Sequence, residues 1–425
     1  MIDMKINTLI FILLFPVLLW AQGKKHIVLI SIDGLRPEFY QGEGYQLPNL
    51  QKLMKAGVYA KRMKSVFPSY TYPSHVAMLT GAMPARSGVY YNAPIGSTGA
   101  WHWFTRGIKI PTLWQAMKKS GLSSSAIEWP VSVGNEITYN IPEIWDVKHP
   151  SDRITEVRKY ATKGLIEEVE GVIGKLDSVN MNEENLSLDR NSAKMAAYIF
   201  KTYKPDFMAL HFACVDGAQH EHGRDHEKVT AAIVNVDKAI GEVLAAIESS
   251  GRRETTTILI VGDHGFSDIH TVIRPNLWLK SFKARFVAAG GSAFLYNANL
   301  VELAAIKSLL DTVALKKRFK VIDRNELDKM GADSAAVLAL SATPGTVFSS
   351  AEKGSLVAPV KGGHHGYDPN LPEMYTGFIA AGAGIGKGKV IEELCVTDIA
   401  PLIAKLLELE FHSPDGKLPA GILIQ

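Results

Sequence analysis

The chain has 425 residues, of which 47% are hydrophobic and 21% are charged, and its formal net charge at pH 7 is +3. This length suits one large α/β domain or a domain with a substantial insertion, and the composition allows a sizeable core. Charge is nearly balanced and no basic block with interleaved aromatic residues occurs, so nucleic-acid binding has no compositional support. The two cysteines, Cys214 and Cys395, exclude a disulfide framework but leave a single pairing open.

The N-terminal segment, residues 1–21, is predicted to be a signal peptide. Lys5 supplies a short positive region, residues 9–20 form a continuous apolar stretch, and Ala21 precedes Gln22 at a suitable cleavage point. The apolar stretch is too short for a comfortable membrane span, which needs about 20 residues. We therefore expect an exported protein, periplasmic or secreted, without a stable membrane span after cleavage. The alternatives are an uncleaved membrane anchor and a buried N-terminal helix.

Short apolar runs and helical patterns alternate along the rest of the chain. The apolar runs predict buried parallel strands at residues 26–32, 207–212, 256–261 and 376–381. The helical patterns lie at residues 50–56, 112–120, 190–203, 228–249 and 397–407. This alternation predicts an α/β fold, a doubly wound and mostly parallel sheet flanked by helices.

Two segments interrupt the alternation. Residues 155–175 have the pattern of a charged amphipathic helix, which we expect on the surface near the functional site. Residues 266–361 mix short strands with helical patterns at 301–314 and 324–330, and we interpret them as an inserted cap subdomain. The main α/β domain would then comprise residues 22–265 and 362–425.

Acidic and histidine side chains gather around the ends of the predicted strands. Open α/β sheets place their active sites at the carboxyl ends of parallel strands, so these side chains are expected to meet. Six side chains with oxygen or nitrogen donors suit two zinc ions that each keep room for water or substrate. Considered one at a time, the candidate ligands also have other interpretations: a turn residue, a helix cap or a coincidental polar pair. The six predicted ligands are Asp33, Asp216, His220, Asp263, His264 and His365.

Other histidines are assigned less direct roles. His211 lies inside a predicted strand, so a core histidine with satisfied hydrogen bonds is the better interpretation. Surface positions, or positions that support the ligands from behind, are favoured for His222, His226 and His270.

Residues 67–81 supply a candidate nucleophile. Thr71 and Pro73 suit the start of a helix and Gly81 suits its end. Thr71 would then lie at a helix N-terminus, where the dipole and free N–H groups favour an anion. A hydroxyl at such a position next to a metal can act as a nucleophile. The alternative is that Thr71 only caps the helix.

The chain resembles the nucleotide pyrophosphatase/phosphodiesterases of the alkaline phosphatase superfamily from His26 to about Leu407. The resemblance implies that Asp216, His220 and His365 hold one zinc ion and that Asp33, Asp263, His264 and Thr71 hold the other. His365 is preferred over His364 because the family ligand directly precedes glycine. The motifs that carry the resemblance are Ser31-Ile32-Asp33-Gly34, Phe67-Pro68-Ser69-Tyr70-Thr71-Tyr72-Pro73-Ser74-His75, Asp216 with His220, Asp263-His264-Gly265 and His365-Gly366.

The resemblance also implies a reaction and a substrate. Thr71 would attack phosphorus to give a covalent phospho-threonine intermediate, and the amide of Asn92 would donate to a phosphoryl oxygen, unless Asn92 is only a turn residue. Tyr72 stands where the family stacks an aromatic ring on a nucleobase, although it could instead pack in the core. We therefore expect a small phosphodiester or nucleotide substrate.

Three alternatives to a diesterase remain at this stage. A phosphomonoesterase or a phosphonate hydrolase could use the same scaffold, because Lys148 or Arg153 could reach the site and bind a dianion. A zinc-stabilised binding protein without catalysis is less favoured, since a structural site needs neither an open position nor a nucleophile.

Overall fold

The protein is described here by a computed structural model that covers residues 24–134, 136–182 and 186–424. The predicted signal peptide, residues 1–21, lies outside the described residues. Within the described ranges, no helix combines the length and apolar character needed to cross a membrane. Cys214 and Cys395 are not joined to each other by a disulfide bond.

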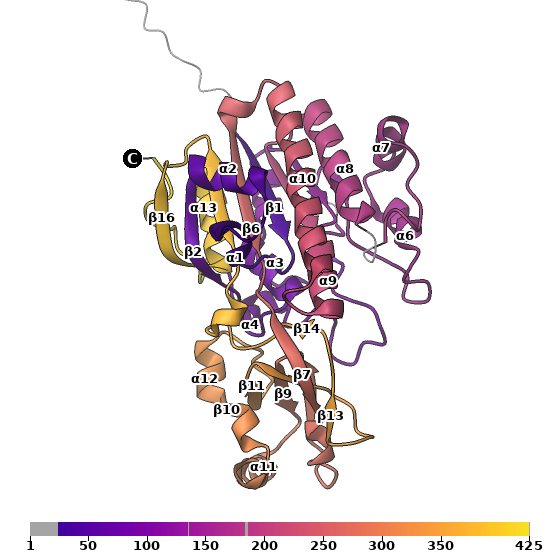
Figure 1. Ribbon diagram of the computed structural model, residues 1–425, viewed down its shortest axis with the longest axis vertical. Coiled ribbons are helices and arrows are strands. Elements are labelled where there is room, and N and C mark those ends of the chain that lie inside the picture. Colours follow the sequence, from indigo (N-terminus) through magenta and orange to yellow (C-terminus); the bar gives the residue numbers. More distant parts are fainter. Residues whose placement is uncertain (1–23, 135, 183–185, 425) are drawn as a thin grey trace, which may run out of the picture.

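An eight-stranded sheet forms the larger part of the molecule (Figure 1). Its strand order is β16-β2-β15-β6-β1-β5-β3-β4. The bounds are β1 His26–Ile32, β2 Val58–Lys64, β3 Ser124–Ile127, β4 Tyr139–Ile141, β5 Phe207–Phe212, β6 Thr256–Gly262, β15 Phe378–Gly382 and β16 Lys389–Cys395. The predicted α/β class with a mostly parallel sheet is confirmed.

One strand direction was predicted wrongly. The run at 376–381 forms β15, which pairs antiparallel with both β6 and β2. All of β15 up to Ala381 is buried, and a strand buried on both faces has the same apolar pattern in either direction. The pattern therefore could not reveal the orientation of β15.

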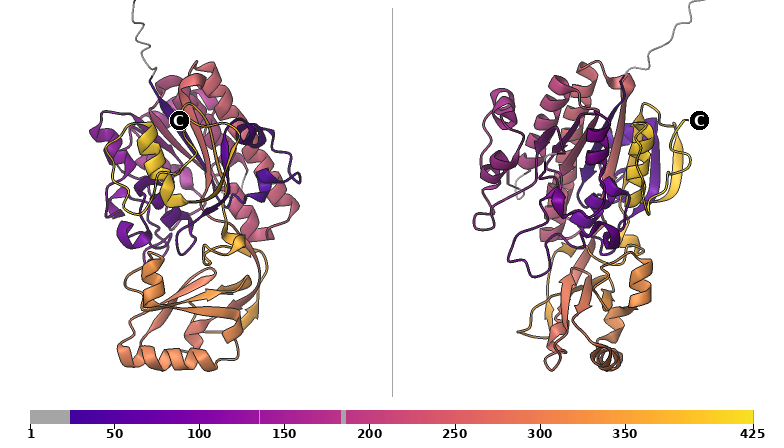
Figure 2. Two further views of the ribbon diagram at one scale, coloured as in Figure 1. Left: turned by 90° about the vertical axis from the view of Figure 1, so that its left-hand side faces the viewer. Right: turned by 180° about the vertical axis from the view of Figure 1, so that it is seen from behind.

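Helices cover both faces of the sheet, as the two views of Figure 2 show. Val28 and Ile30 of β1 join one core with helices α2, α8 and α10, while Ile27 and Leu29 join a second core with α3, α5 and α13. The bounds are α2 Pro48–Ala56, α3 Thr71–Thr80, α5 Leu113–Lys119, α8 Ser187–Tyr203, α10 Glu227–Ser249 and α13 Ile399–Leu406. Further helices are α1 Glu38–Gln41, α4 Pro84–Ser87 and α9 Cys214–His222.

The amphipathic segment forms two helices instead of one. They are α6 Arg153–Tyr160 and α7 Leu165–Ile173, and Gly164 between them has φ of 82°. The extended backbone of Ala161 ends α6, and the left-handed Gly164 precedes α7. The pattern at 155–175 was therefore correct in type but wrong in continuity.

The segment expected to be inserted folds around sheets of its own, below the large sheet in Figure 1. One sheet has the order β10-β11-β9-β8, and the other has β7 at its centre with β12, β13 and β14 beside it. The strands are β7 Ser267–Ile273, β8 Arg285–Ala289, β9 Ser292–Tyr296, β10 Phe319–Asp323, β11 Leu338–Ala342, β12 Gly345–Phe348, β13 Val357–Pro359 and β14 Gly363–His364. Helices α11 Leu300–Thr312 and α12 Arg324–Lys329 accompany them.

This smaller unit contacts the backbone of the larger one close to His365. The N–H of Gly291 donates to the carbonyl of His365 at 3.0 Å. A Cβ on Gly366 would lie 2.3 Å from the carbonyl oxygen of Ala289, and Gly366 has φ of 85°, so both the close approach and the conformation require glycine here. The smaller unit thus fixes the course of the chain at His365.

Candidate metal centre

Three neighbouring parallel strands bring the predicted ligands together. Ile32 at the end of β1 pairs with Phe212 of β5 on one side and with Gly262 of β6 on the other. Asp33 and Asp263 are the next residues along their strands, and α9, which carries Asp216 and His220, begins two residues after β5. The same register that forms the sheet therefore places these side chains at one edge.

The first group comprises Asp33, Asp263 and His264, which each offer a ligand atom within 4.8 Å of the others. The Nε2 of His264 lies 3.3 Å from Oδ1 of Asp33 and 3.2 Å from Oδ2 of Asp263. The hydroxyl of Thr71 lies 3.3 Å from the same Nε2. All four residues are buried.

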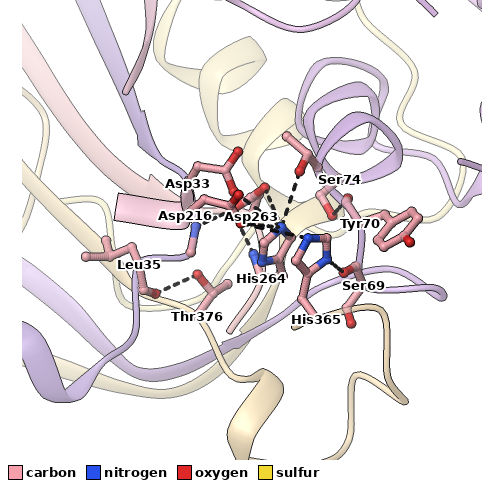
Figure 3. Close-up of polar contacts among 12 residues, drawn as sticks. Asp33, Leu35, Ser69, Tyr70, Ser74, Asp216, Asp263, His264, His365 and Thr376 are labelled. Atoms are coloured by element: carbon pink, nitrogen blue, oxygen red, sulfur yellow. Dashed lines mark hydrogen bonds and ion pairs between the residues drawn. The ribbon is translucent and has the colours of Figure 1, made fainter. Parts of the chain in front are cut away.

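The second group adjoins the first on the side of α9. Two triplets that share His365 bring their ligand atoms within 4.8 Å of one another: Asp216, His264 and His365, and His220, His364 and His365. The Nε2 of His220 lies 3.3 Å from Asp216, one helical turn before it. The rings of His264 and His365 stack with centroids 3.7 Å apart. Figure 3 shows the carboxylates of Asp33, Asp216 and Asp263 converging on His264, with His365 beside it.

Backbone carbonyls fix the orientation of three imidazole rings. The Nδ1 atoms of His220, His264 and His365 lie 3.0, 3.1 and 2.9 Å from the carbonyl oxygens of Gly363, Gly265 and Ser69. A carbonyl only accepts, so each Nδ1 must donate, and each Nε2 of a neutral ring turns a lone pair toward the carboxylates. Burial, followed by the neighbouring imidazoles, lowers the pKa of His365 well below its ordinary value, which favours the neutral ring. This arrangement is typical of metal-ligating histidines.

Carboxylate charge also accumulates in the site. Burial by itself raises the pKa of Asp263, but His264, then His75 and the N–H of Gly34, hold that pKa below its ordinary value. The Oδ2 of Asp263 is buried, and no described residue donates a hydrogen bond to it. Carboxylate oxygens and imidazole nitrogens are therefore crowded together in a buried site. A divalent cation fits this donor set, and mixed oxygen and nitrogen donors suit zinc.

The choice between His364 and His365 can be argued from their hydrogen bonds. The Nδ1 of His364 accepts from the N–H of His365 at 3.0 Å. Burial, then His220, lowers the pKa of His364 to about 3, so its ring is neutral and must carry its proton on Nε2. His365 instead presents a lone pair on Nε2, which supports His365 as the ligand.

Thr71 is the first residue of α3, and Tyr70 occupies the N-cap position without a side-chain cap. The interpretation of Thr71 as a helix cap is therefore wrong, because its hydroxyl lies against His264 instead.

The Oδ1 of Asn92 accepts from the N–H of Tyr72 at 3.0 Å, in the first turn of α3. Since that oxygen is engaged, the NH₂ group of Asn92 is the part of its side chain left to donate to an anion beside Thr71.

Tyr72 lies in a different environment from the one the resemblance implies. Its ring is fully buried and meets the ring of Trp101 edge-on at 5.1 Å between centroids. The structure thus places Tyr72 in the core, which was the alternative interpretation, and the half-buried Trp101 lies over it. In this arrangement the ring of Tyr72 is not open to a nucleobase.

Sequence reasoning missed the residues that support the ligands from behind. His211 is buried, as expected, but its Nε2 lies 3.3 Å from Oδ2 of Asp33 and its Nδ1 lies 3.0 Å from the carbonyl of Glu128. The pairing of His211 with Ser31 of β1 brings the ring close to Asp33, and the sequence alone gives no signal of that register. Asp189 of α8 accepts from the N–H groups of Ala213 at 3.0 Å and Cys214 at 3.3 Å, so it anchors the start of α9.

The remaining histidines lie outside the two groups. The rings of His222 and His226 stack on each other with centroids 4.6 Å apart, and His270 is exposed. Lys148 is exposed as well, whereas Arg153 is buried.

We predict that Asp189→Ala destabilises the fold and weakens zinc binding. The substitution leaves two buried N–H groups without their acceptor, which costs about 1–3 kcal/mol, and it loosens the helix that carries Asp216 and His220. Urea unfolding and the bound zinc at limiting zinc concentration measure the two effects.

Asp237→Ala is the matched control. Asp237 of α10 accepts from the N–H groups of Asn49 and Leu50 at the start of α2, which carries no predicted ligand. It should destabilise the protein similarly but leave the bound zinc unchanged. Full zinc occupancy in Asp189→Ala would contradict the assigned role of Asp189.

Comparisons with known proteins agree with this fold. Residues 27–368 match the family model described as type I phosphodiesterase / nucleotide pyrophosphatase. The chain is 22% identical to bis(5'-adenosyl)-triphosphatase enpp4 of Mus musculus over 92% of this chain and 79% of the relative. It is also 22% identical to the venom phosphodiesterase CdcPDE of Crotalus durissus collilineatus over 92% of this chain and 45% of the relative.

Solved structures show the same architecture. Murine ectonucleotide pyrophosphatase / phosphodiesterase 5 superposes with a TM-score of 0.70 at 18% sequence identity, covering 92% of this chain and 98% of that one. An inactive variant of the same murine protein, solved in complex with AMP, gives a TM-score of 0.69 at 19% identity over 92% of this chain and 97% of that one. Because the family model spans most of the chain, this protein belongs to the type I phosphodiesterase / nucleotide pyrophosphatase family.

Proposed function

We propose that the protein is a two-zinc phosphodiesterase or nucleotide pyrophosphatase that uses Thr71 as its nucleophile. The observation that carries the proposal is the hydroxyl of Thr71, buried at the first residue of α3 and 3.3 Å from Nε2 of His264. A hydroxyl among converging carboxylates and imidazoles can be activated as a nucleophile when a metal is bound. Family membership and the AMP complex of the murine neighbour support a nucleotide or related phosphate substrate.

The zinc ions would be held by Asp33, Asp263 and His264 with Thr71, and by Asp216, His220 and His365. When bound, they would supply positive charge that stabilises the attacking and leaving oxygens. The carbonyls of Gly363, Gly265 and Ser69 hold the three imidazole rings in the orientation that presents Nε2. The ligands therefore need little rearrangement on binding the metal.

The proposed reaction proceeds in two displacements at phosphorus. In the first, the Thr71 hydroxyl gives up its proton to solvent and a bond forms between Thr71 Oγ1 and phosphorus. The bond from phosphorus to the leaving oxygen breaks, and its electron pair stays on that oxygen. In the second, water displaces Thr71 and restores its hydroxyl. Asn92 donates from its NH₂ group to a non-bridging oxygen, and the N-terminus of α3 favours negative charge there.

A phosphomonoesterase is the second candidate, and the buried cation Arg153 is the observation that favours it. A monoester carries a further negative charge on the transferred group, so it calls for a cation beside Thr71. Arg153 lines the cavity of Asp216 and His220 instead, and we therefore retain the diesterase or pyrophosphatase as the better supported activity.

We also propose that the protein is exported. The short apolar segment after Lys5 supports this, as do the names of similar proteins, which include an ectonucleotide pyrophosphatase and venom phosphodiesterases. Mass spectrometry of the mature protein is expected to find Gln22 as its first residue. An N-terminus at Met1 would contradict cleavage.

Comparison of two aryl esters tests the reaction class. With the zinc-loaded protein, kcat/KM for bis-p-nitrophenyl phosphate is expected to exceed that for p-nitrophenyl phosphate, because the buried cation Arg153 lines the cavity of Asp216 and His220, whose wall does not include Thr71. A strong preference for the monoester would overturn the diesterase assignment.

Thr71→Ala tests the nucleophile. Turnover is expected to fall on the order of 10³-fold or more, because the covalent route is lost. Zinc content measured by elemental analysis should remain near that of the parent, since the three side chains of each group stay in place. Thr71→Ser serves as the control and should keep measurable turnover. If Thr71→Ala kept full activity, Thr71 would not be the nucleophile. If the parent protein bound zinc but showed no turnover of either ester, the alternative of a binding protein without catalysis would hold.

A further inference from the structure

One strand of the smaller unit, β9, contributes to two different hydrophobic cores (Figure 1). Side chains alternate between the two faces of a strand. Ala293 and Leu295 belong to the core of the smaller unit itself. Phe294 and Tyr296 lie on the opposite face and belong to a second cluster, which the smaller unit shares with segments of the larger one. This face of β9 is therefore part of the contact between the two units.

Phe294 contacts both segments of the larger unit that carry a proposed catalytic group. Its ring centroid lies 5.2 Å from that of Phe67, in the segment that leads to Thr71. It also lies 5.4 Å from that of Tyr91, the residue before Asn92, in an edge-to-face arrangement. The three aromatic rings are buried. A ring packed between two segments holds them at a fixed separation, because protein interiors are close-packed.

Tyr296 adds a directed hydrogen bond to this packing. Its hydroxyl donates to Oδ2 of Asp333 at 2.7 Å and lies 2.6 Å from the hydroxyl of Tyr91. Since a phenol has one proton and Tyr296 gives it to Asp333, Tyr91 must donate to the oxygen of Tyr296. Asp333 is itself fixed, because its Oδ1 accepts from the N–H of Ala335 at 2.9 Å and its carbonyl accepts from Arg324 at 2.7 Å. The chain thus joins Tyr91 to a fixed point in the smaller unit.

Burial makes the hydroxyl of Tyr91 dependent on this partner. The side chains of Tyr91, Tyr296 and Asp333 are all buried. Burial raises the pKa of Tyr91 well above its ordinary value, so its hydroxyl stays protonated. A buried hydroxyl without an acceptor is unfavourable, so loss of the Tyr296 oxygen favours movement of Tyr91 toward another acceptor or water. Asn92 directly follows Tyr91 and would move with it.

Asn92 has to be placed accurately to act on an anion beside Thr71. A donor stabilises a developing oxyanion over a narrow range of distances, about 2.7–3.1 Å. The carbonyl of Asn92 accepts from the N–H of His102 at 2.9 Å, but the chain beyond Asn92 soon becomes exposed, at residues 94–96. On the other side of Asn92, Tyr91 is buried against the smaller unit. The position of Asn92 therefore depends on where Tyr91 is held.

We propose that Tyr296 is a positioning residue for the reaction at Thr71. Through the hydroxyl of Tyr91, it holds Asn92 where the NH₂ group of Asn92 can donate to the phosphoryl group in the transition state. The smaller unit then takes part in catalysis through a residue that supplies no atom to the reaction. This inference rests on the proposed function and adds a role for β9 to it.

A double-mutant cycle on the zinc-loaded protein tests the proposal, with bis-p-nitrophenyl phosphate as substrate. Asn92→Ala should lower kcat about 100- to 1,000-fold, as the loss of one oxyanion donor does. Tyr296→Phe removes one hydroxyl and keeps the ring, and it should lower kcat about 10-fold with KM changed by less than about twofold, because the displaced donor acts in the transition state. In the Asn92→Ala background, Tyr296→Phe should change kcat by less than about twofold, since the donor through which it acts is already absent.

Tyr40→Phe is the matched control. The hydroxyl of Tyr40 is also buried, and it accepts from the N–H of Phe378 at 3.1 Å. The two residues belong to α1 and β15, neither of which carries a predicted site residue. Tyr40→Phe should therefore lower the urea midpoint of unfolding, as Tyr296→Phe does, but leave kcat unchanged. Bound zinc, measured by elemental analysis, should equal that of the parent in every variant, because no predicted ligand is replaced.

The outcomes separate this inference from the proposed function. It is wrong if kcat of Tyr296→Phe stays within about twofold of the parent, or if kcat falls by the same factor in the Asn92→Ala background; the phosphodiesterase assignment then stands. Loss of zinc in Tyr296→Phe, or an equal loss of kcat in Tyr40→Phe, would also overturn it. Full activity of Asn92→Ala would remove the donor role of Asn92 and this inference with it, but leave Thr71 as the nucleophile. If the parent cleaves neither aryl ester, the proposed function itself fails.

Discussion

The close approach of buried carboxylates to an imidazole at one edge of the sheet is the constraint on which the rest of the structure depends. Asp33, Asp216 and Asp263 point oxygens at Nε2 of His264 over distances of 3.2 to 3.9 Å, so three buried carboxylates converge on one imidazole. Burying several carboxylates together costs folding free energy, so favourable packing elsewhere in the fold must compensate for it. The buried β1, β5 and β6 strands and the two cores on either side of the sheet provide that support. A cation that neutralises the site would in turn stabilise the folded protein.

The support extends beyond the sheet to groups that never contact a ligand atom. Asp189 anchors the start of α9, and the smaller unit holds His365 through the N–H of Gly291. A buried hydrogen-bonded chain also joins the two units: the hydroxyls of Tyr91 and Tyr296 lie 2.6 Å apart, and Tyr296 donates to Asp333 at 2.7 Å. Tyr91 directly precedes Asn92. The smaller unit thus contributes to the position of two parts of the site, at His365 and at Asn92.

Much of the larger sheet could be predicted because its central strands are buried on both faces. The runs at 26–32, 207–212 and 256–261 coincide with β1, β5 and β6 to within a residue. The strands β2 and β16 were missed because several of their side chains are exposed and charged, as in Val58–Lys64 and Lys389–Cys395. The direction of β15 and the break at Gly164 depend on contacts and backbone conformation that a hydrophobic pattern does not record. Among site residues, His211 was interpreted only as core because a single sequence does not show that its ring faces Asp33.

The sequence by itself determined the chemistry that is available to this protein: oxygen and nitrogen donors after buried strands, a threonine at the start of a helix, and motifs that resemble one family. Only the tertiary structure decided which atoms face each other, because that depends on strand register and on the carbonyls that orient each ring. It directed the hydroxyl of Thr71 toward His264, placed Tyr72 beneath Trp101, and brought Arg153 into the cavity of Asp216 and His220. These positions result from packing between segments far apart in the chain, and local sequence patterns carry no information about such contacts.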